Sequence, residues 1–510
     1  MSLSVKTCNA FGADPGVMTN HDFDVIIIGA GLSGIGTACQ IASQHPDKTI
    51  AVLERRERLG GTWDLFRYPG IRSDSDMFTF GYKFRPWVDY KVLAPGAAIR
   101  DYISDTAAEH GIDEKVHYGL KIVAADWSSD EARWAVTAVR EATGEKLTYT
   151  CGFLVSATGY YNHDAGFLPT FPGSDQFDGQ QIHPQFWPED LDYAGKKVVV
   201  IGSGATAVTL VPSMAGTAEH VTMLQRSPSY IFAVPAFDKI SAVLNRFLPE
   251  KLVNRLARKR NIALQRAIYV SCRRWPTMMR RFLLAHVRRQ VGPSVDMANF
   301  TPAYMPWDER LCAVPDGDLF NALKAGEASV VTDQIDTFTK TGIKLKSGRE
   351  LEADIIVTAT GLQVQMLGGL KLTVDGEPRE LHDGLTYKAV LVEDVPNLAW
   401  IFGYTNAPWT LKSDIAGEYI CRLLAHMEDN GYAVATPRDD DASADGGGIL
   451  DALQSGYVQR AKHTLPRQGS RGPWKVTMDY GHDCKMLQDD PIEDGHLQFE
   501  ARRPALARVG

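Results

Sequence analysis

No apolar run in the chain approaches the ~20 residues that a helix needs to cross a bilayer, so we expect no transmembrane span. The seven cysteines are scattered and form no Cys-x-x-Cys pair. This excludes dithiol redox chemistry and a structural zinc site, and it fits a reducing cytosol. The net charge of −8 is small for 510 residues and argues against nucleic acid as the main partner. We predict no metal site.

The N-terminal residues lack the apolar segment of a signal peptide, so we expect a cytoplasmic protein. We expect residues 1–20 to form a disordered lead, in which Met18 is a candidate for the functional start. A chain of 510 residues is longer than one hydrophobic core usually serves, so two or three domains are expected.

A glycine-rich turn follows the first apolar segment of the chain. Asp24–Gly29 (DVIIIG) is typical of a buried parallel strand, and the sequence continues as GAGLSG from Gly29 to Gly34. In such a turn the glycines permit a tight bend, let the backbone approach a pyrophosphate and let the helix pack on the strand. The next strand ends in Glu54, where a carboxylate can bind ribose hydroxyls; a solvated glutamate is the alternative.

A rigid loop rich in glycine and aromatic residues extends from Gly60 to Asp74 (GGTWDLFRYPGIRSD). The backbone N–H groups of its two leading glycines can face a flavin or its phosphates. Asp74 follows two arginines, so a local ion pair is the alternative role for its carboxylate. We therefore predict that the first unit binds FAD through these residues: Gly29, Gly31, Ser33, Gly34, Glu54, Gly61, Thr62, Trp63 and Asp74.

A second strand and glycine turn lie at Lys197–Ala207, with alanine as a permitted third member of the turn. Here Arg226 occupies the place that Glu54 has in the first unit. An acid suits a free ribose hydroxyl, whereas an arginine suits a 2′-phosphate; an exposed arginine without a ligand is the alternative. We therefore predict NADPH binding through these residues: Gly202, Gly204, Thr206, Ala207, Arg226 and Ser227. Thr360 and Gly361, at a strand end where the chain crosses between domains, are also predicted to bind a cofactor.

Two further segments connect or interrupt these units. The segment Phe177–Pro188 (FDGQQIHPQFWP) lies between them, and its His183 could sense one cofactor and report to the other. Residues 238–292 read as basic amphipathic helices, in which Glu250 is the only acid between Ala242 and Gln290. They are either a helical lid with a solvated charged side or a face that contacts an anionic membrane peripherally, on the inner face of the cell membrane.

These patterns predict an α/β fold with two Rossmann-like dinucleotide-binding domains and a helical insertion in the NADP domain. We expect the FAD domain to be discontinuous, at residues 21–160 and 350–500. The linker with the His183 motif is expected at residues 161–195. The NADP domain is expected at residues 196–349, with its insertion at 238–292.

Two stretches match the fingerprints of a known family at every fixed position. Phe177–Pro188 has the Phe-x-Gly-x-x-x-His-x-x-x-Trp-Pro pattern of Baeyer–Villiger monooxygenases, and Gly60–Asp74 has their longer second pattern. From about Asp22 to the C-terminal region the chain thus resembles the class B flavoprotein monooxygenases, most closely the actinobacterial branch with the ethionamide-activating enzymes. This resemblance implies FAD and NADPH as cofactors and O₂ as co-substrate.

The resemblance also implies roles for individual residues. Arg310 resembles the catalytic arginine of the family, Asp74 its supporting carboxylate, and His183 the residue that couples NADP binding to domain movement. Glu309 departs from the family, where lysine is frequent, so Arg226 must carry more of the selectivity for the 2′-phosphate. Pro408 departs too, in a loop where a small polar residue is usual.

The implied reaction converts a small-molecule hydrophobic ketone, such as a long-chain or aryl ketone, to an ester or lactone through a C4a-peroxyflavin, with sulfide or thioamide oxygenation as a second activity. Three alternatives stay open at this point. One is a flavin monooxygenase that oxygenates nitrogen or sulfur without acting on ketones. Another is an NADPH oxidase that releases peroxide. The third is a membrane-bound cofactor-binding protein without turnover.

Overall fold

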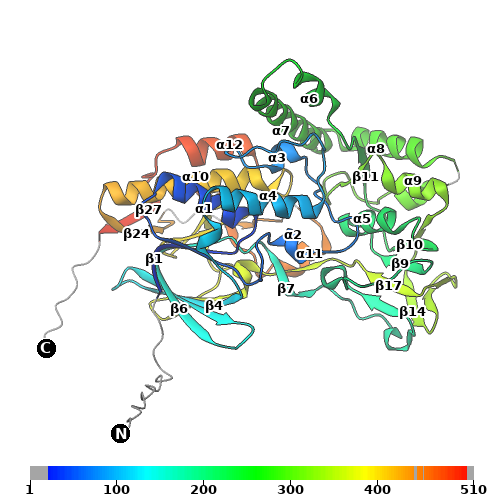
Figure 1. The fold of residues 1–510 in the computed structure, drawn as a ribbon, viewed down its shortest axis with the longest axis horizontal. Helices are drawn as coiled ribbons and strands as arrows, with labels where there is room; N and C mark the ends of the chain where they lie inside the picture. The colour runs from blue at the N-terminus through cyan, green and yellow to red at the C-terminus, as the bar shows by residue number, and fades with distance from the viewer. Residues whose placement is uncertain (1–20, 294, 441–444, 452, 502–510) are drawn as a thin grey trace, which may run out of the picture.

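The computed structural model describes residues 21–293, 295–440, 445–451 and 453–501, so the expected lead over residues 1–20 lies outside it. Two sheets organise these residues, one on the left and one on the right in Figure 1. The first has eleven strands, with the main order β20-β19-β4-β5-β6-β1-β2-β3. Its strands are β1 (His21–Ile28), β2 (Ile50–Leu53), β3 (Val116–His117), β4 (Leu120–Ser128), β5 (Arg133–Arg140), β6 (Lys146–Ser156), β19 (Lys371–Val374), β20 (Glu377–Arg379), β21 (Thr386–Tyr387), β22 (Leu391–Val392) and β23 (Leu398–Trp400).

The centre of this sheet is parallel and buried on both faces, which explains the unbroken apolar run of β1. Val25 and Ile27 pack into one core cluster, and Ile26 and Ile28 pack into another on the opposite face. The first cluster includes α1 (Leu32–Gln44), α4 (Gly96–Glu109) and α10 (Trp409–Asp429). Shorter helices of this part are α2 (Thr62–Leu65), α3 (Met77–Phe80), α11 (Gly456–Ala461) and α12 (Tyr480–Cys484).

The second sheet has five parallel strands in the order β13-β10-β9-β17-β8. They are β8 (Gln180–Ile182), β9 (Lys197–Ile201), β10 (His220–Gln225), β13 (Ala328–Thr332) and β17 (Ile355–Thr358), and α5 (Ala205–Met214) and α9 (Asp318–Ala325) pack beside them. Two of these strands come from segments that we expected elsewhere. β8 lies in the expected linker, and β17 lies in residues expected to belong to the first domain.

The chain crosses between the two sheets twice, and the crossings pair with each other. β7 (Tyr161–Gly166) and β18 (Leu362–Val364) form a two-stranded antiparallel ribbon. Each begins soon after a strand of the main sheets ends, β6 in the first case and β17 in the second. Any movement of one sheet relative to the other must therefore bend or shift this ribbon.

The remaining strands form small sheets. A three-stranded sheet contains β14 (Ile335–Thr339), β15 (Gly342–Leu345) and β16 (Glu350–Glu352). Three pairs complete the set: β11 (Ile231–Val234) with β12 (Cys312–Pro315), β24 (Tyr432–Pro437) with β27 (Leu497–Ala501), and β25 (Asp445–Gly448) with β26 (Arg467–Gly469).

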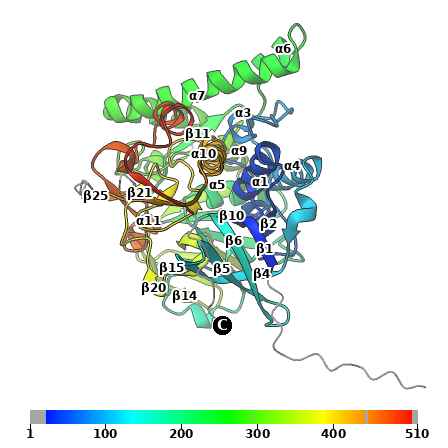
Figure 2. The same ribbon diagram turned by 90° about the vertical axis from the view of Figure 1, so that its left-hand side faces the viewer.

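The basic segment forms three helices, α6 (Lys239–Leu244), α7 (Glu250–Arg274) and α8 (Pro276–Val291). Figure 2 shows α7 lying across one side of the molecule, with α6 at its end. Arg258 of α7 donates to the carbonyl oxygen of Gly81 at 2.6 Å and to Asp414 of α10 at 3.0 Å. The inserted helix therefore rests on the first part of the molecule as well as on the second. Within the described residues, no helix has both the length and the apolar character to cross a membrane.

Candidate cofactor and active site

A cavity of about 370 Å³ opens at the carboxyl ends of β1 and β2, where ligands bind in sheets of this kind. Its volume lies in the range of small-molecule sites. The cavity is lined by the start of α1, the Gly60–Ser75 loop, the end of β6, the start of β7, the start of α5 and Arg310. Elements of both sheets thus meet around one space.

The floor of the cavity is made of glycines that leave no room for side chains. Gly29 has φ +101°, and a Cβ there would lie 2.8 Å from the carbonyl oxygen of Ala157. A Cβ on Gly61 would lie 2.9 Å from Cα of Gly31, so the two backbones nearly touch. The N-terminus of α1 has no side-chain cap and no acid in its first turn. Its free N–H groups and the bare backbone fit a pyrophosphate, as in FAD.

The third glycine of the turn has a different role from the other two. A Cβ on Gly34 would lie 1.8 Å from the carbonyl oxygen of Gly29. Gly34 therefore allows the close packing of α1 on the end of β1, and it does not line the cavity.

Glu54 ends β2 with its carboxylate held at the edge of the cavity. The N–H groups of Ala30 and Arg56 donate to its two oxygens at 2.6 and 2.8 Å. Burial raises the pKa of Glu54, and these two backbone hydrogen bonds oppose the shift. Each oxygen keeps a lone pair, so the carboxylate can still accept from ribose hydroxyls.

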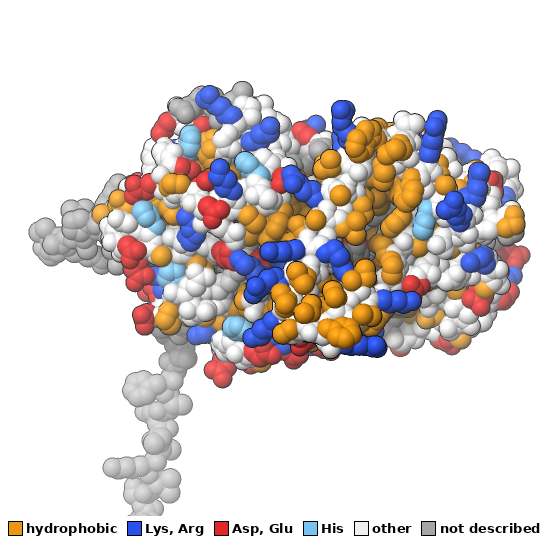
Figure 3. Space-filling view, turned by 90° about the horizontal axis from the view of Figure 1, so that it is seen from above, with side chains coloured by type: hydrophobic (Ala, Val, Ile, Leu, Met, Phe, Trp, Pro, Cys, Tyr) orange, Lys and Arg blue, Asp and Glu red, His pale blue; other side chains and the backbone are white. Residues whose placement is uncertain are grey.

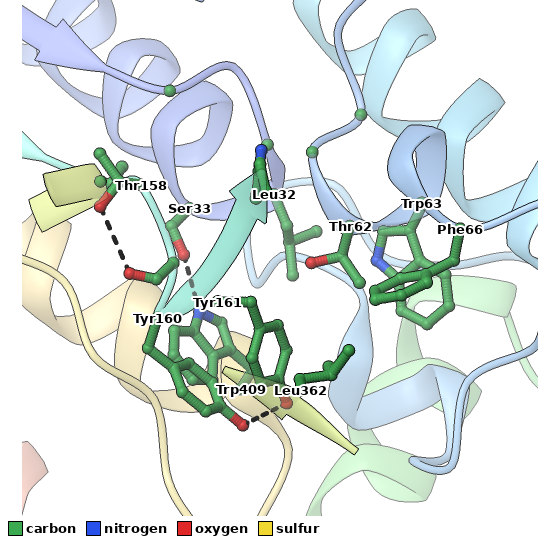
Figure 4. Close-up of a pocket in the computed structure, with 18 of the residues that line it drawn as sticks. Leu32, Ser33, Thr62, Trp63, Phe66, Thr158, Tyr160, Tyr161, Leu362 and Trp409 are labelled. Carbon is green, nitrogen blue, oxygen red and sulfur yellow. Dashed lines mark hydrogen bonds between the residues drawn. The ribbon is translucent and has the colours of Figure 1, made fainter. Parts of the chain in front are cut away.

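Aromatic side chains form the opposite wall of the cavity (Figure 4). Trp409 donates its indole N–H to Ser33 Oγ at 2.8 Å, which ties α10 to the first turn of α1. The ring of Tyr160 stacks on Trp409 with 5.3 Å between centroids and 11° between planes. The hydroxyls of Tyr160 and Tyr161 lie 2.6 Å apart.

Arg310 reaches the same cavity from the loop before β12. Its Nε is buried and has no hydrogen-bond partner among the described residues. Burial alone would lower the pKa of Arg310, but nearby tyrosine phenols and the Asp74 carboxylate raise it above its usual value. A permanently charged donor thus faces the cavity without a protein partner for one of its N–H groups.

Asp74 also lines the cavity, but it is exposed and makes no ion pair with Arg310 in this structure. Its neighbouring arginines are engaged elsewhere, since Arg72 binds Asp318 at 2.7 Å and Arg67 binds Glu189. The local ion pair considered from the sequence is therefore absent. The carboxylate is left facing the cavity, within electrostatic reach of Arg310.

The turn of the second unit has the same construction as that of the first. Gly202 has φ +142°, and a Cβ there would lie 2.3 Å from the carbonyl oxygen of Ala359. Open space surrounds the Cβ position of Gly204, and α5 starts there without a side-chain cap or an acid. Thr206 on this helix also lines the main cavity. An anion at the second turn would therefore lie close to a ligand in the first.

Arg226 and Ser227, which directly follow β10 beside the second glycine turn, are exposed. Ser203 donates its hydroxyl to the carbonyl oxygen of Ser227 at 3.0 Å. Arg226 is exposed beside Glu309. Burial raises the pKa of Glu309, and the positive charge of Arg226 opposes that shift. The arginine predicted to select the phosphate thus has a carboxylate as neighbour.

His183 lies at the ribbon between the sheets, away from the cavity. Its Nδ1 accepts from the N–H of Gln185 at 3.2 Å, so its Nε2 carries the proton and donates to the carbonyl oxygen of Gly361, also at 3.2 Å. A Cβ on Gly166 would lie 2.0 Å from the imidazole ring. His183 therefore contacts the last residue of β7 and the residue directly before β18. Burial lowers its pKa, which favours this neutral form.

The family model described as flavin-binding monooxygenase-like matches residues 23–366 of the chain. The chain belongs to this family. MymA of Mycobacterium tuberculosis (strain ATCC 25618 / H37Rv) is 68% identical over 486 residues, which cover 94% of this chain and 98% of MymA. The FAD-containing monooxygenase EthA of Mycolicibacterium smegmatis (strain ATCC 700084 / mc(2)155) is 49% identical over 492 residues, covering 96% and 99%. The predicted class of flavoprotein monooxygenase is confirmed.

A solved structure described as an oxidized steroid monooxygenase bound to NADP has the same fold. It aligns with a TM-score of 0.76 at 21% sequence identity, covering 94% of this chain and 100% of that chain. The predicted α/β class with two dinucleotide-binding units is thereby confirmed.

Most residues predicted for the flavin do line the cavity of this monooxygenase. They are Gly29, Gly31, Ser33, Glu54, Gly61, Thr62, Trp63 and Asp74, joined by Arg310 and Thr206. The others that we predicted for the cofactors lie outside the cavity wall. They are Gly34, Gly202, Gly204, Ala207, Arg226, Ser227, Thr360 and Gly361.

Thr360 and Gly361 lie directly before β18 of the crossing ribbon. Thr360 donates its hydroxyl to the carbonyl oxygen of Phe167 at 2.6 Å, and Gly361 accepts from His183. Sequence reasoning missed the phenols beside Arg310, which belong to Tyr160, Tyr161 and Tyr457. The only signal for the first two was their place directly after the strand that ends in Ala-Thr-Gly.

Proposed function

We propose that this monooxygenase uses FAD, NADPH and O₂ to convert hydrophobic ketones into esters or lactones, and that it also oxygenates sulfides. The observation that carries the proposal is Arg310, a half-buried cation whose buried Nε–H has no partner among the described residues, at the point where both nucleotide units meet. The relatives named above support FAD, and the solved steroid monooxygenase supports NADP.

FAD fits the residues of the cavity. The glycine turn and the start of α1 would hold its pyrophosphate, and Glu54 would hold its ribose. When bound, FAD would supply hydride acceptance from NADPH and the activation of O₂. The wall of Tyr160 and Trp409 would exclude water from the reacting oxygen.

Arg310 would stabilise the negative charge that forms on the carbonyl oxygen when an oxygen atom is added to a ketone. A preorganised charged donor in such a place is commonly worth about 3–4 kcal/mol. Asp74, on the same cavity, would orient Arg310, and His183 would couple NADPH binding to movement at the crossing ribbon. A sulfide develops no such oxyanion, because its sulfur attacks the transferred oxygen directly.

Replacement of Arg310 separates these reactions. With a ketone, we expect Arg310→Ala to lower kcat for ester formation by about 10²–10³-fold, with FAD content unchanged. With a sulfide, we expect a clearly smaller loss of sulfoxide formation. Arg310→Lys keeps the positive charge but lacks the planar guanidinium, so its kcat with a ketone should lie between those of the wild type and Arg310→Ala. Ester formation at the normal rate in Arg310→Ala would refute the role proposed for this residue.

A further inference from the structure

The helices α6–α8 concentrate positive charge in a protein that is acidic overall. Residues 239–291 contain fourteen arginines and lysines and one acid, a net charge of +13 (14 − 1). Since the whole chain has a net charge of −8, the rest carries −21 (−8 − 13). The proposed reaction makes no use of this asymmetry.

Only some of these cations are needed to hold the helices in place. Five of them bind partners in the protein: Arg258 with Asp414, Arg260 with Asp238, Arg266 with Asp479, Arg273 with Asp308, and Arg280 with the carbonyl oxygen of Pro302. Nine others are exposed and form no ion pair within the part of the chain that the structure describes. They are Lys239, Arg246, Lys251, Arg255, Lys259, Arg274, Arg281, Arg288 and Arg289.

Large apolar side chains project from the same helices and from the turns that join them. The first group is Ile240 and Val243 of α6 with Phe247 in the turn that follows, and Phe247 is 80% exposed. The second group is Trp275, directly before α8, with Met278 and Phe282 on that helix, and their exposed fractions are 54%, 55% and 55%. A third group runs along α7: Leu252, Leu256, Leu264 and Val270.

The orientation of α7 is fixed by contacts on its other side. Val253, Ala257 and Cys272 are buried. The side-chain amides of Asn261 and Gln265 donate to Asp76, the first at 2.7 Å. These contacts hold the helix so that its remaining apolar residues and cations face solvent. Figure 3 looks onto this face, where orange apolar side chains gather with blue cations around them and red acids lie mostly toward the edges.

We propose that this outer face of α6–α8 docks on a membrane that contains anionic lipids. In an amphipathic helix at a membrane surface, aromatic and aliphatic side chains enter the headgroup region, and cations bind lipid phosphates. A lid that is only solvated needs the cations but gains nothing from exposing Phe247 and Trp275. A nucleic acid would neutralise the cations but leave the apolar groups in water.

The test is flotation of the full-length holoenzyme with vesicles at low ionic strength. One set of vesicles is phosphatidylcholine, and the other is an equal mixture of phosphatidylcholine and phosphatidylglycerol. We expect the protein to float with the anionic vesicles and to stay unbound with the neutral ones. Added salt should weaken binding, because it screens the charged part of the attraction.

Two variants separate the apolar and charged contributions. The triple change Phe247→Ser, Trp275→Ser and Phe282→Ser should lower the partition coefficient at least about tenfold. The double change Arg255→Glu and Lys259→Glu should also lower the partition coefficient at least about tenfold. Matched controls are Leu168→Ser, at a side chain 61% exposed elsewhere, and Lys344→Glu with Lys346→Glu, which changes the net charge equally. Both controls should bind like the wild type, and all variants should retain FAD.

Three results would overturn the proposal. The wild type could fail to float with anionic vesicles at low ionic strength. It could bind neutral and anionic vesicles equally, with no effect of the Arg255 and Lys259 reversal. Alternatively, the triple apolar variant could float normally but change its oligomeric state without vesicles, in which case a second copy of the chain covers this face.

Discussion

Tyr161 is a half-buried residue on the cavity wall beside Arg310, and its hydroxyl pairs with that of Tyr160. Burial raises its pKa well above the usual value, so it stays protonated and can donate a hydrogen bond. We predict that Tyr161→Phe lowers kcat with a ketone about tenfold, as expected for the loss of one hydrogen bond. FAD content and the KM for NADPH should not change. Steady-state kinetics beside flavin absorbance would measure this, and an unchanged kcat would make Tyr161 a packing residue.

Glu309 places a carboxylate beside Arg226, which we propose to bind the 2′-phosphate of NADPH. A nearby negative charge repels the phosphate by roughly 1 kcal/mol at short range in water. We therefore predict that Glu309→Gln lowers the KM for NADPH about fivefold and leaves the KM for NADH unchanged. The control Glu327→Gln removes the same charge near the start of β10, where the backbone carbonyl oxygen of Glu327 accepts from the N–H of Val221 and is unaffected by the change. An equal effect on both cofactors would exclude a contact with the phosphate.

At the scale of elements, the crossing ribbon of β7 and β18 depends on the neutral form of His183. Protonation would place an N–H against the N–H of Gln185, which now donates to Nδ1. Because the pKa of His183 is lowered in the folded protein, the unfolded chain takes up a proton first, near pH 6.5. The stability that His183 contributes is therefore present above that pH and is lost as the pH falls below it.

We predict that His183→Asn raises the KM for NADPH and lowers kcat together, about tenfold in kcat/KM, without loss of FAD. The amide can still accept from Gln185 but is too short to reach Gly361. Thermal unfolding between pH 7 and 5 provides the readout specific to the ring, because the wild type should lose more stability than the variant. A variant whose stability changes with pH as in the wild type would contradict this role of His183 at the crossing ribbon.

At the scale of the whole molecule, the inserted helix α7 is attached to α10 beside the first sheet by the ion pair of Arg258 with Asp414. Both side chains are largely buried, and burial raises the pKa of Asp414 to about 6 despite the opposing charge of Arg258. Removal of one partner leaves a buried charge alone, so we predict that Arg258→Ala costs about 3–5 kcal/mol in unfolding free energy. Asp414→Asn in the same chain should restore part of it. Denaturant titration of the wild type, the two single variants and the double variant gives the coupling free energy between Arg258 and Asp414. If the losses of unfolding free energy in the two single variants simply add up in the double variant, the ion pair does not stabilise the fold.

Short sequence patterns were enough to predict many residues of the site, but not which distant segments come together to form it. The glycines at 29, 31 and 34 were predictable because backbone sterics restrict each position, and Glu54 because it ends the next strand. The neighbours of Arg310 were not, since Tyr160, Tyr457 and Arg310 come from distant segments that only the folded chain brings together. Sequence periodicity also missed β8, because three residues are too few to show an alternating pattern.

The central claim is that the enzyme transfers an oxygen atom from O₂ to its substrate. The most direct measurement supplies isotopically labelled O₂ with NADPH and a hydrophobic ketone, and follows label in the ester together with NADPH consumed and peroxide released. The account predicts one labelled oxygen in each ester, with product formed in step with NADPH use. Consumption of NADPH that yields only peroxide and an unchanged ketone would contradict it and leave an NADPH oxidase.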